Sequence, residues 1–144
     1  CMQAIETRDI KPGDVIVTRN QGLKGGPAMG GSASLILFAL DAAGLAKTTA
    51  FVTDGQLSGL CLKGLTIAEV SPEAATGGPI GKVRDGDVIT ISVANRSIDV
   101  ALSPAELAAR EAPGYRVAAS GYLSNFRQDV RGLETGGVLL PIKS

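Results

Sequence analysis

Histidine and tryptophan are absent from this chain of 144 residues, and only two cysteines are present. Without histidine, the chain alone cannot assemble a Ser-His-Asp or Cys-His nucleophile, or the usual imidazole metal site. The spacing of Cys1 and Cys61 suggests neither a zinc motif nor a disulfide framework. We expect Cys61 to be a buried, inert thiol. Any proton transfer must therefore use serine, tyrosine, lysine or a carboxylate.

Aromatic residues and net charge are also scarce. Three phenylalanines and two tyrosines leave little for stacking on nucleobases, and fourteen basic residues balance fourteen acidic ones. No apolar run approaches the ~20 residues that span a bilayer, and the first residues carry no signal-peptide pattern. We therefore expect a soluble, cytoplasmic protein whose partners are small molecules or proteins, with no nucleic acid and no membrane.

The first half of the chain has the pattern of a βαβ unit. A β-branched strand is predicted over 15–19, a helix N-capped by Ser32 and terminated by Gly44, and a second strand over 48–53. This order favours two parallel strands joined by a crossover helix. The length predicts one domain over residues 1–144, which would bury roughly two thirds of its unfolded surface.

The second half has shorter elements. A strand is predicted over 65–70 and a single helical turn over 71–75. A turn at 84–87 then precedes two alternating strands, 88–93 and 97–102, which are predicted to pair antiparallel with each other. Ser103-Pro104-Ala105-Glu106 is a capping box, so a helix is expected from Pro104 to Arg110. Residues 123–133 have the spacing of a short amphipathic helix. The expected fold class is mixed α/β.

The segment from Phe51 to Gly59 has two competing interpretations. A short apolar run ends abruptly at Asp54, and Ser58 follows four residues later between turn-forming glycines. Loops at strand ends often carry catalytic groups, because the sheet fixes the backbone while the loop exposes a side chain. The alternative is a tight turn in which Asp54 and Ser58 only cap backbone N–H groups. The segment taken alone favours the turn.

A glycine-rich tract over 21–32 invites a phosphate-binding interpretation, because helix N-termini present unpaired N–H groups to anions. Gly25 and Gly30 have the P-loop spacing, but Gly31-Ser32 follows and the required lysine is missing. Lys24 precedes the expected helix and could bind a carboxylate or phosphate as a mobile point charge. The better functional interpretation is a loop shaped for close approach of a ligand or of another domain.

Four aspartates could suggest a site for a hard metal ion. The pair Asp85 and Asp87 flanks Gly86, however, and Asp-Gly pairs are standard turn formers. Asp54 and Asp99 lie elsewhere in the chain, and no EF-hand spacing is present. The sequence favours turn geometry over metal binding.

Several motifs occur in one order that is specific to a known family. They are Lys11-Pro12-Gly13-Asp14-Val15, Lys24-Gly25-Gly26-Pro27, Thr53-Asp54-Gly55-Gln56-Leu57-Ser58-Gly59, the stretch from Val70 to Ile80, Asp85-Gly86-Asp87, Asn95-Arg96, Gly121-Tyr122-Leu123 and Thr135-Gly136-Gly137-Val138-Leu139. Over nearly its whole length, the chain resembles the C-terminal region of the dihydroxy-acid dehydratase and 6-phosphogluconate dehydratase family.

The resemblance implies a swivelling β/β/α domain, with a β-barrel-like mixed sheet and flanking helices. Family members remove water from 2,3-dihydroxy acids or sugar acids to give 2-keto acids. The resemblance further implies a role in branched-chain amino-acid biosynthesis. Ser58 matches the serine proposed to abstract the C2 proton. The resemblance also implies an iron–sulfur cluster and Mg²⁺ in the full-length enzyme, supplied by an N-terminal domain or subunit, and no cofactor in this chain. We expect a homo-oligomer.

The resemblance assigns the remaining site residues by motif. Contacts to a small carboxylic-acid substrate are expected from the two loops that follow the first two strands, namely from Lys24, Gly25, Gly26, Thr53, Asp54, Gly55 and Ser58. The family's two glutamates beside the glycine-rich motif are replaced here by Gln21 and Gly31. Gln21 is a weak metal-ligand candidate, because a neutral amide is a poorer ligand for a hard cation than a carboxylate.

Two hypotheses follow. In the first, the chain is the C-terminal part of a dehydratase, with Ser58 as base and a partner domain holding the cluster. In the second, it is a non-catalytic, stand-alone relative that binds a small acid or another subunit. The missing carboxylates favour the second hypothesis, whereas the retained segment from Thr53 to Gly59 favours the first.

Overall fold

A three-stranded parallel sheet forms the centre of the protein in the computed structural model, which describes residues 1–26, 31–61, 63–114 and 120–139. Strands β1 (Val15–Thr18), β2 (Ala50–Thr53) and β3 (Leu65–Ile67) are hydrogen-bonded in that order. Val15 is in register with Ala50, and Ala50 with Leu65. The predicted parallel pair is confirmed, and all three strands end at the same edge of the sheet.

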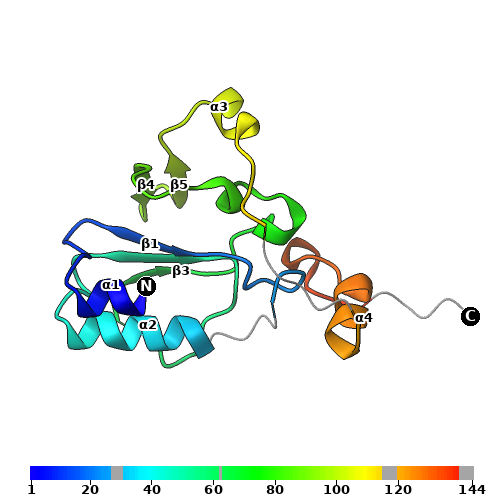
Figure 1. Cartoon of the computed structure of the whole chain (residues 1–144), viewed down its shortest axis with the longest axis horizontal. Coiled ribbons are helices and arrows are strands. Elements are labelled where there is room, and N and C mark those ends of the chain that lie inside the picture. The colour runs from blue at the N-terminus through cyan, green and yellow to red at the C-terminus, as the bar shows by residue number, and fades with distance from the viewer. Residues whose placement is uncertain (27–30, 62, 115–119, 140–144) are drawn as a thin grey trace, which may run out of the picture.

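Two helices cover one face of this sheet (Figure 1). Helix α1 (Met2–Glu6) contributes Ile5, and helix α2 (Gly31–Ala42) contributes a stripe at helical spacing that packs on Ile16 and Phe51. Because α2 begins at Gly31, Ser32 lies inside its first turn, and the prediction that Ser32 is the N-cap is wrong. Gly44 follows the helix with φ +75, as expected of a terminating glycine.

The opposite face of the sheet packs against the middle of the chain. Val52 is buried there with Ala74 of the 3₁₀ helix η1 (Ala74–Thr76) and Ile80 of η2 (Pro79–Lys82). Ile91 of the hairpin joins the same cluster from β4 (Ile89–Ser92), which pairs antiparallel with β5 (Ser97–Val100). The described strands therefore form two separate sheets, and their closure into a barrel stays a prediction.

The capping box holds helix α3 (Pro104–Ala109) as predicted. Ser103 Oγ accepts a hydrogen bond from the backbone N–H of Glu106, and Glu106 Oε2 accepts one from the N–H of Ser103 at 2.8 Å. Arg110 ends the helix and pairs with Asp87 through two hydrogen bonds of 2.5 and 3.0 Å. This ion pair connects α3 to the turn before β4.

The C-terminal segment lies beyond the carboxyl edge of the parallel sheet (Figure 1). Helix α4 (Tyr122–Asp129) is shorter than the predicted 123–133, because Val130 leaves the helix, forms a bridge with Leu139 and is buried against Leu23. Leu133 then begins the 3₁₀ helix η3 (Leu133–Thr135). Residues near the end of the chain are thereby brought next to the loop that follows β1.

Candidate functional site

Asp54 joins three segments at the carboxyl edge of the sheet. It follows β2, is completely buried, and its Oδ2 accepts hydrogen bonds from the backbone N–H groups of Asn20 (3.0 Å) and Ala74 (2.9 Å). Its Oδ1 accepts another from Gln21 N–H at 2.9 Å. Asp54 thus caps backbone N–H groups, as the turn interpretation expected, but these groups belong to the loops after β1 and β3 and not to its own turn. This side chain fixes both loops against the end of β2.

Ser58 follows on the loop that Asp54 anchors. Thr53 is also fully buried, and its Oγ1 accepts a hydrogen bond from Gly55 N–H at 3.0 Å. A Cβ at Gly55 would lie 2.6 Å from Gln21 Cβ, so the two loops are in contact. Ser58 is half-buried, and its Oγ accepts a hydrogen bond from Leu60 N–H at 3.3 Å. Its role as a base stays a prediction.

Glu73 is a second buried carboxylate, and it holds the glycine-rich loop. Its Oε1 accepts hydrogen bonds from the backbone N–H groups of Lys24 (2.8 Å) and Gly25 (2.7 Å), while only 4% of its surface is exposed. Burial raises the pKa of Glu73, and the backbone donors partly oppose that rise. The predicted helical turn at 71–75 is thus a 3₁₀ helix preceded by an acid that binds another loop.

Close packing explains three glycines of the tract after β1. A Cβ at Gly22 would meet Glu73 Oε2 at 2.5 Å, and one at Gly25 would meet the Asn20 backbone at 2.8 Å. At Gly26 it would meet the Asn20 carbonyl oxygen at 2.9 Å. The close approach expected of a ligand or another domain is, at these positions, made by the chain itself. Residues 27–30, including Pro27 and Gly30, lie outside the described residues.

Lys24 is held in place rather than mobile. Its Nζ donates a hydrogen bond to the Arg127 carbonyl oxygen at 2.6 Å, and Arg127 Nε donates one to the Lys24 carbonyl oxygen. These reciprocal bonds attach the β1 loop to α4. The expectation of a mobile point charge is therefore wrong for this residue.

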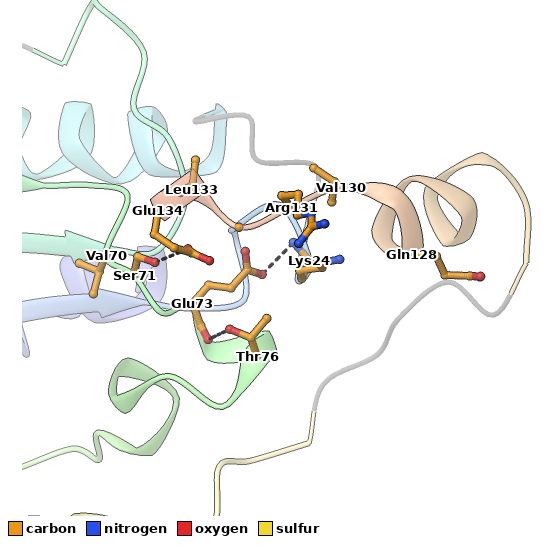
Figure 2. Close-up of a pocket in the computed structure, with 11 residues that line it drawn as sticks. Lys24, Val70, Ser71, Glu73, Thr76, Gln128, Val130, Arg131, Leu133 and Glu134 are labelled. Carbon is orange, nitrogen blue, oxygen red and sulfur yellow. Dashed lines mark hydrogen bonds between the residues drawn. The ribbon is translucent and has the colours of Figure 1, made fainter. Parts of the chain in front are cut away.

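A cavity of about 360 Å³ opens beside Lys24 (Figure 2). Its other polar groups come from the turn after β3 and from the C-terminal segment: Ser71, Glu73, Thr76, Gln128, Arg131 and Glu134. The Ser71 hydroxyl donates a hydrogen bond to Glu134 Oε2 at 2.7 Å and lowers the pKa of Glu134. Lys24 and Arg131 bring two cations to this cavity, and Glu73 and Glu134 bring two carboxyl groups, so its lining is of mixed charge.

The two predicted site loops lie side by side, as the hydrogen bonds from Asn20 and Gln21 to Asp54 show. The pocket, however, differs from the prediction. Ser58 is not among the residues that line the Lys24 cavity, and the cavity extends instead toward α4 and η3. The βαβ order predicts a pocket between the two loops, because adjacent parallel strands end at the same edge of the sheet. Local spacing gives no sign that the C-terminal segment packs against Lys24.

Cys61 is partly buried and packs against the core below α2. Its Sγ donates a hydrogen bond to Ser34 Oγ at 3.3 Å, which places the turn after Ser58 beside the first half of α2. The expected packing role is thus confirmed, although the thiol is less buried than predicted.

The described residues do not form a site for the cluster or the divalent metal that the family implies. Among them, no group of three or more histidine, cysteine, aspartate or glutamate side chains comes together. Asp54 and Glu73, the acids nearest the two loops, already accept backbone N–H groups. Gln21 offers only an amide oxygen, so these residues do not fit either group by themselves.

Sequence patterns gave no indication that Glu73 holds the loop after β1. It lies 48 and 49 residues from the two N–H groups that it binds, so no local pattern links them. One signal was present in the sequence: Glu73 is an acid in the turn Ser71-Pro72-Glu73-Ala74, which lies between two predicted strands, and it has no apparent partner within that turn.

Glu73→Gln is expected to change how the free energy of unfolding depends on pH. Folding raises the pKa of Glu73, so the folded chain binds the proton more tightly than the unfolded chain. The free energy of unfolding of wild type should therefore fall, relative to that of Glu73→Gln, as the pH rises from about 4.3 through the raised pKa. Urea unfolding of both proteins from pH 4 upward would measure the difference.

Glu134→Gln is the matched control for this comparison. The pKa of Glu134 is lowered, so the stability that it contributes is lost as the pH falls. The pH dependence of Glu134→Gln relative to wild type should therefore have the opposite sign. A difference between wild type and Glu73→Gln that is constant with pH would contradict the assignment of Glu73.

Comparison with known proteins places these features in one family. Residues 1–137 match the family model described as "Dihydroxy-acid/6-phosphogluconate dehydratase C-terminal". "Dihydroxy-acid dehydratase 1" of Methanosarcina acetivorans is 39% identical over 142 residues, which are 96% of this chain and 25% of the relative. "Dihydroxy-acid dehydratase 2" of Mesorhizobium japonicum is 41% identical over 145 residues, 98% of this chain and 24% of the relative.

The chain spans about a quarter of the length of these curated relatives. No helix among the described residues is long and apolar enough to cross a bilayer. The family match over 137 residues and the Asp54 loop that carries Ser58 agree with the resemblance drawn from the motifs. The chain belongs to the C-terminal domain family of the dihydroxy-acid and 6-phosphogluconate dehydratases.

Proposed function

We propose that this chain is the C-terminal, swivelling domain of a hydro-lyase that converts a 2,3-dihydroxy acid or sugar acid into a 2-keto acid. The observation that carries the proposal is the Asp54 anchor, which holds the family's serine loop against the loop bearing Lys24. The two relatives are dihydroxy-acid dehydratases, which favours a role in branched-chain amino-acid biosynthesis. The protein that contains this domain would be cytoplasmic and homo-oligomeric.

Ser58 is the proposed base that takes the C2 proton of the substrate. A serine hydroxyl is a poor base, so it must act as an alkoxide stabilised by positive charge. The remaining three quarters of the polypeptide would supply that charge and the electrophile for the departing hydroxyl. Lys24 is the cation of this chain that we propose contacts the substrate, because Asp54 holds its loop beside the Ser58 loop.

The cluster and Mg²⁺ would be held outside this chain. When bound, they would supply a Lewis acid for the leaving hydroxyl. The contribution of this chain is to orient Ser58, to present Lys24 and to cover the site. Asp54 serves the first purpose and Glu73 the second, because each fixes the backbone of the loop concerned.

The purified 144-residue chain is expected to bind no iron–sulfur cluster. Two cysteines cannot provide the three or more thiolates that such clusters normally require. Iron and sulfide analysis after anaerobic reconstitution would measure this. Stoichiometric iron and sulfide with charge-transfer absorbance in a monomer would contradict it.

The function is tested by joining the chain to the rest of a dehydratase. Residues 1–144 replace the matching segment of the Mesorhizobium japonicum relative, and the product is here called the joined polypeptide. We expect 2-keto acid formation from 2,3-dihydroxy acids or sugar acids by the joined polypeptide and none by the isolated chain. Turnover by the isolated chain, or a folded joined polypeptide with its cluster intact but no turnover, would overturn the proposal.

The alternative, a stand-alone binding module, is favoured by one observation. Gln21 and Gly31 stand where the family has glutamates, so the chain has lost two carboxylates next to the substrate loop. A cluster-loaded joined polypeptide that binds a dihydroxy acid without converting it would support this alternative.

A further inference from the structure

Helix α2 carries apolar side chains both on its buried side and on its exposed side. Its inner stripe is buried on the sheet and consists of Ala33, Ile36, Leu37 and Leu40. On the other side Leu35 is 64% exposed and Phe38 is 48% exposed. The one charged residue of the helix, Asp41, lies near its end and pairs with Lys63 at 2.6 Å. The exposed side of a helix is normally polar, so exposed apolar side chains on α2 indicate a surface that a partner covers.

The loop that carries Ser58 adds a further exposed apolar side chain near the start of α2. Leu60 is 73% exposed, and the neighbouring Cys61 is attached to Ser34 of α2 by its Sγ–Oγ hydrogen bond. Leu35 follows Ser34 directly in the sequence. We call the surface formed by Leu35, Phe38 and Leu60 the α2 outer face.

We propose that the α2 outer face is the docking surface for the remaining, N-terminal part of the dehydratase polypeptide. The inference rests on the proposed function, because it takes that part as the partner. The chain spans about a quarter of its relatives, so a protein segment about three times its size remains to be placed. The surface begins two residues after Ser58, which is the group that the partner must approach.

The absence of charged side chains from most of α2 also fits a permanent protein interface. Residues 31–40 include no charged side chain, and charge is depleted at the centres of stable protein interfaces. Large apolar side chains that are exposed near one another are typical of interaction sites on soluble proteins. The docked segment is therefore expected to present an apolar surface to Leu35 and Phe38 and to exclude water next to the Ser58 loop.

Thiol labelling at position 38 tests the docking surface without using activity. Phe38→Cys is introduced, in a Cys1→Ser background, into the isolated chain and into the joined polypeptide, and maleimide labelling is followed by peptide mass spectrometry. We expect position 38 to react at least about tenfold more slowly in the joined polypeptide, because a covered thiol reacts only after local opening. Ala94→Cys, at the exposed turn between β4 and β5, is the matched control and should react equally in both.

A second measurement, the thermal unfolding of a double variant, tests the docking surface even if the joined polypeptide assembles incorrectly around the cysteine at position 38. Leu35→Gln/Phe38→Gln should leave the thermal unfolding of the isolated chain unchanged and lower that of the joined polypeptide. Equal labelling of position 38 in both proteins, or an equal effect of the double variant on both, would overturn the proposal. Protection of position 38 in a dimer of the isolated chain would assign the face to a second copy and overturn it as well. Loss of dehydratase activity with protection retained would refute only the proposed function.

Discussion

Asp54→Ala is expected to lower the free energy of unfolding of the isolated chain by at least about 3 kcal/mol. The side chain is fully buried and accepts three backbone hydrogen bonds from two other loops. Hydrogen bonds to a charged acceptor are stronger than neutral ones, and the alanine would leave three donors without their acceptor. Urea denaturation followed by circular dichroism would measure the loss.

Asp14→Ala is the matched control for this prediction. Asp14 is an exposed aspartate that accepts one backbone hydrogen bond, from Lys11 N–H at 2.8 Å. Its removal should cost less than about 1 kcal/mol, because water can replace the lost partner. If Asp54→Ala cost no more than Asp14→Ala, Asp54 would not anchor the loops.

Local patterns predicted the elements whose signals lie within a few residues. The β-branched run gave β1, and the capping box gave α3 with both of its reciprocal bonds. Gly44 correctly marked the end of α2, whereas the start was misplaced because Ser32 was taken as a cap. The capping box and the terminating glycine act through near neighbours, which the sequence displays directly, whereas β1 was indicated by its β-branched residues although it pairs with the distant β2.

The candidate site was predicted only where its parts follow parallel strands. The adjacency of the loops after β1 and β2 followed from the βαβ order, and Asp54 as a backbone acceptor was one of two interpretations. The contact of Lys24 with Arg127, 103 residues away, had no sequence signal. Helix α4 was predicted too long because another distant contact had no sequence signal: Val130 packs against Leu23 and does not continue the helix.

Ser58→Ala is expected to lower the kcat of the joined polypeptide by about 10²- to 10⁴-fold, the range for loss of a positioned base. Stability should change little, because the Ser58 Oγ makes one long hydrogen bond, 3.3 Å from Leu60 N–H. The KM should change less than kcat if Ser58 acts on the C2 proton rather than in binding. Initial rates of 2-keto acid formation would measure both constants.

Ser97→Ala is the control, since Ser97 is an exposed serine at the start of β5 on the hairpin. Its activity should equal that of wild type. The difference in kcat between Ser58→Ala and Ser97→Ala distinguishes loss of the base from a general effect of removing a serine hydroxyl.

The central claim, that this chain brings the catalytic serine to a dehydratase site completed by another domain, is tested most directly by one comparison of rates. The joined polypeptide, its Ser58→Ala variant and the isolated chain are assayed together for 2-keto acid formation, with equal cluster content in the two joined proteins. The account predicts turnover by the joined polypeptide alone. Equal turnover by wild type and Ser58→Ala would contradict it.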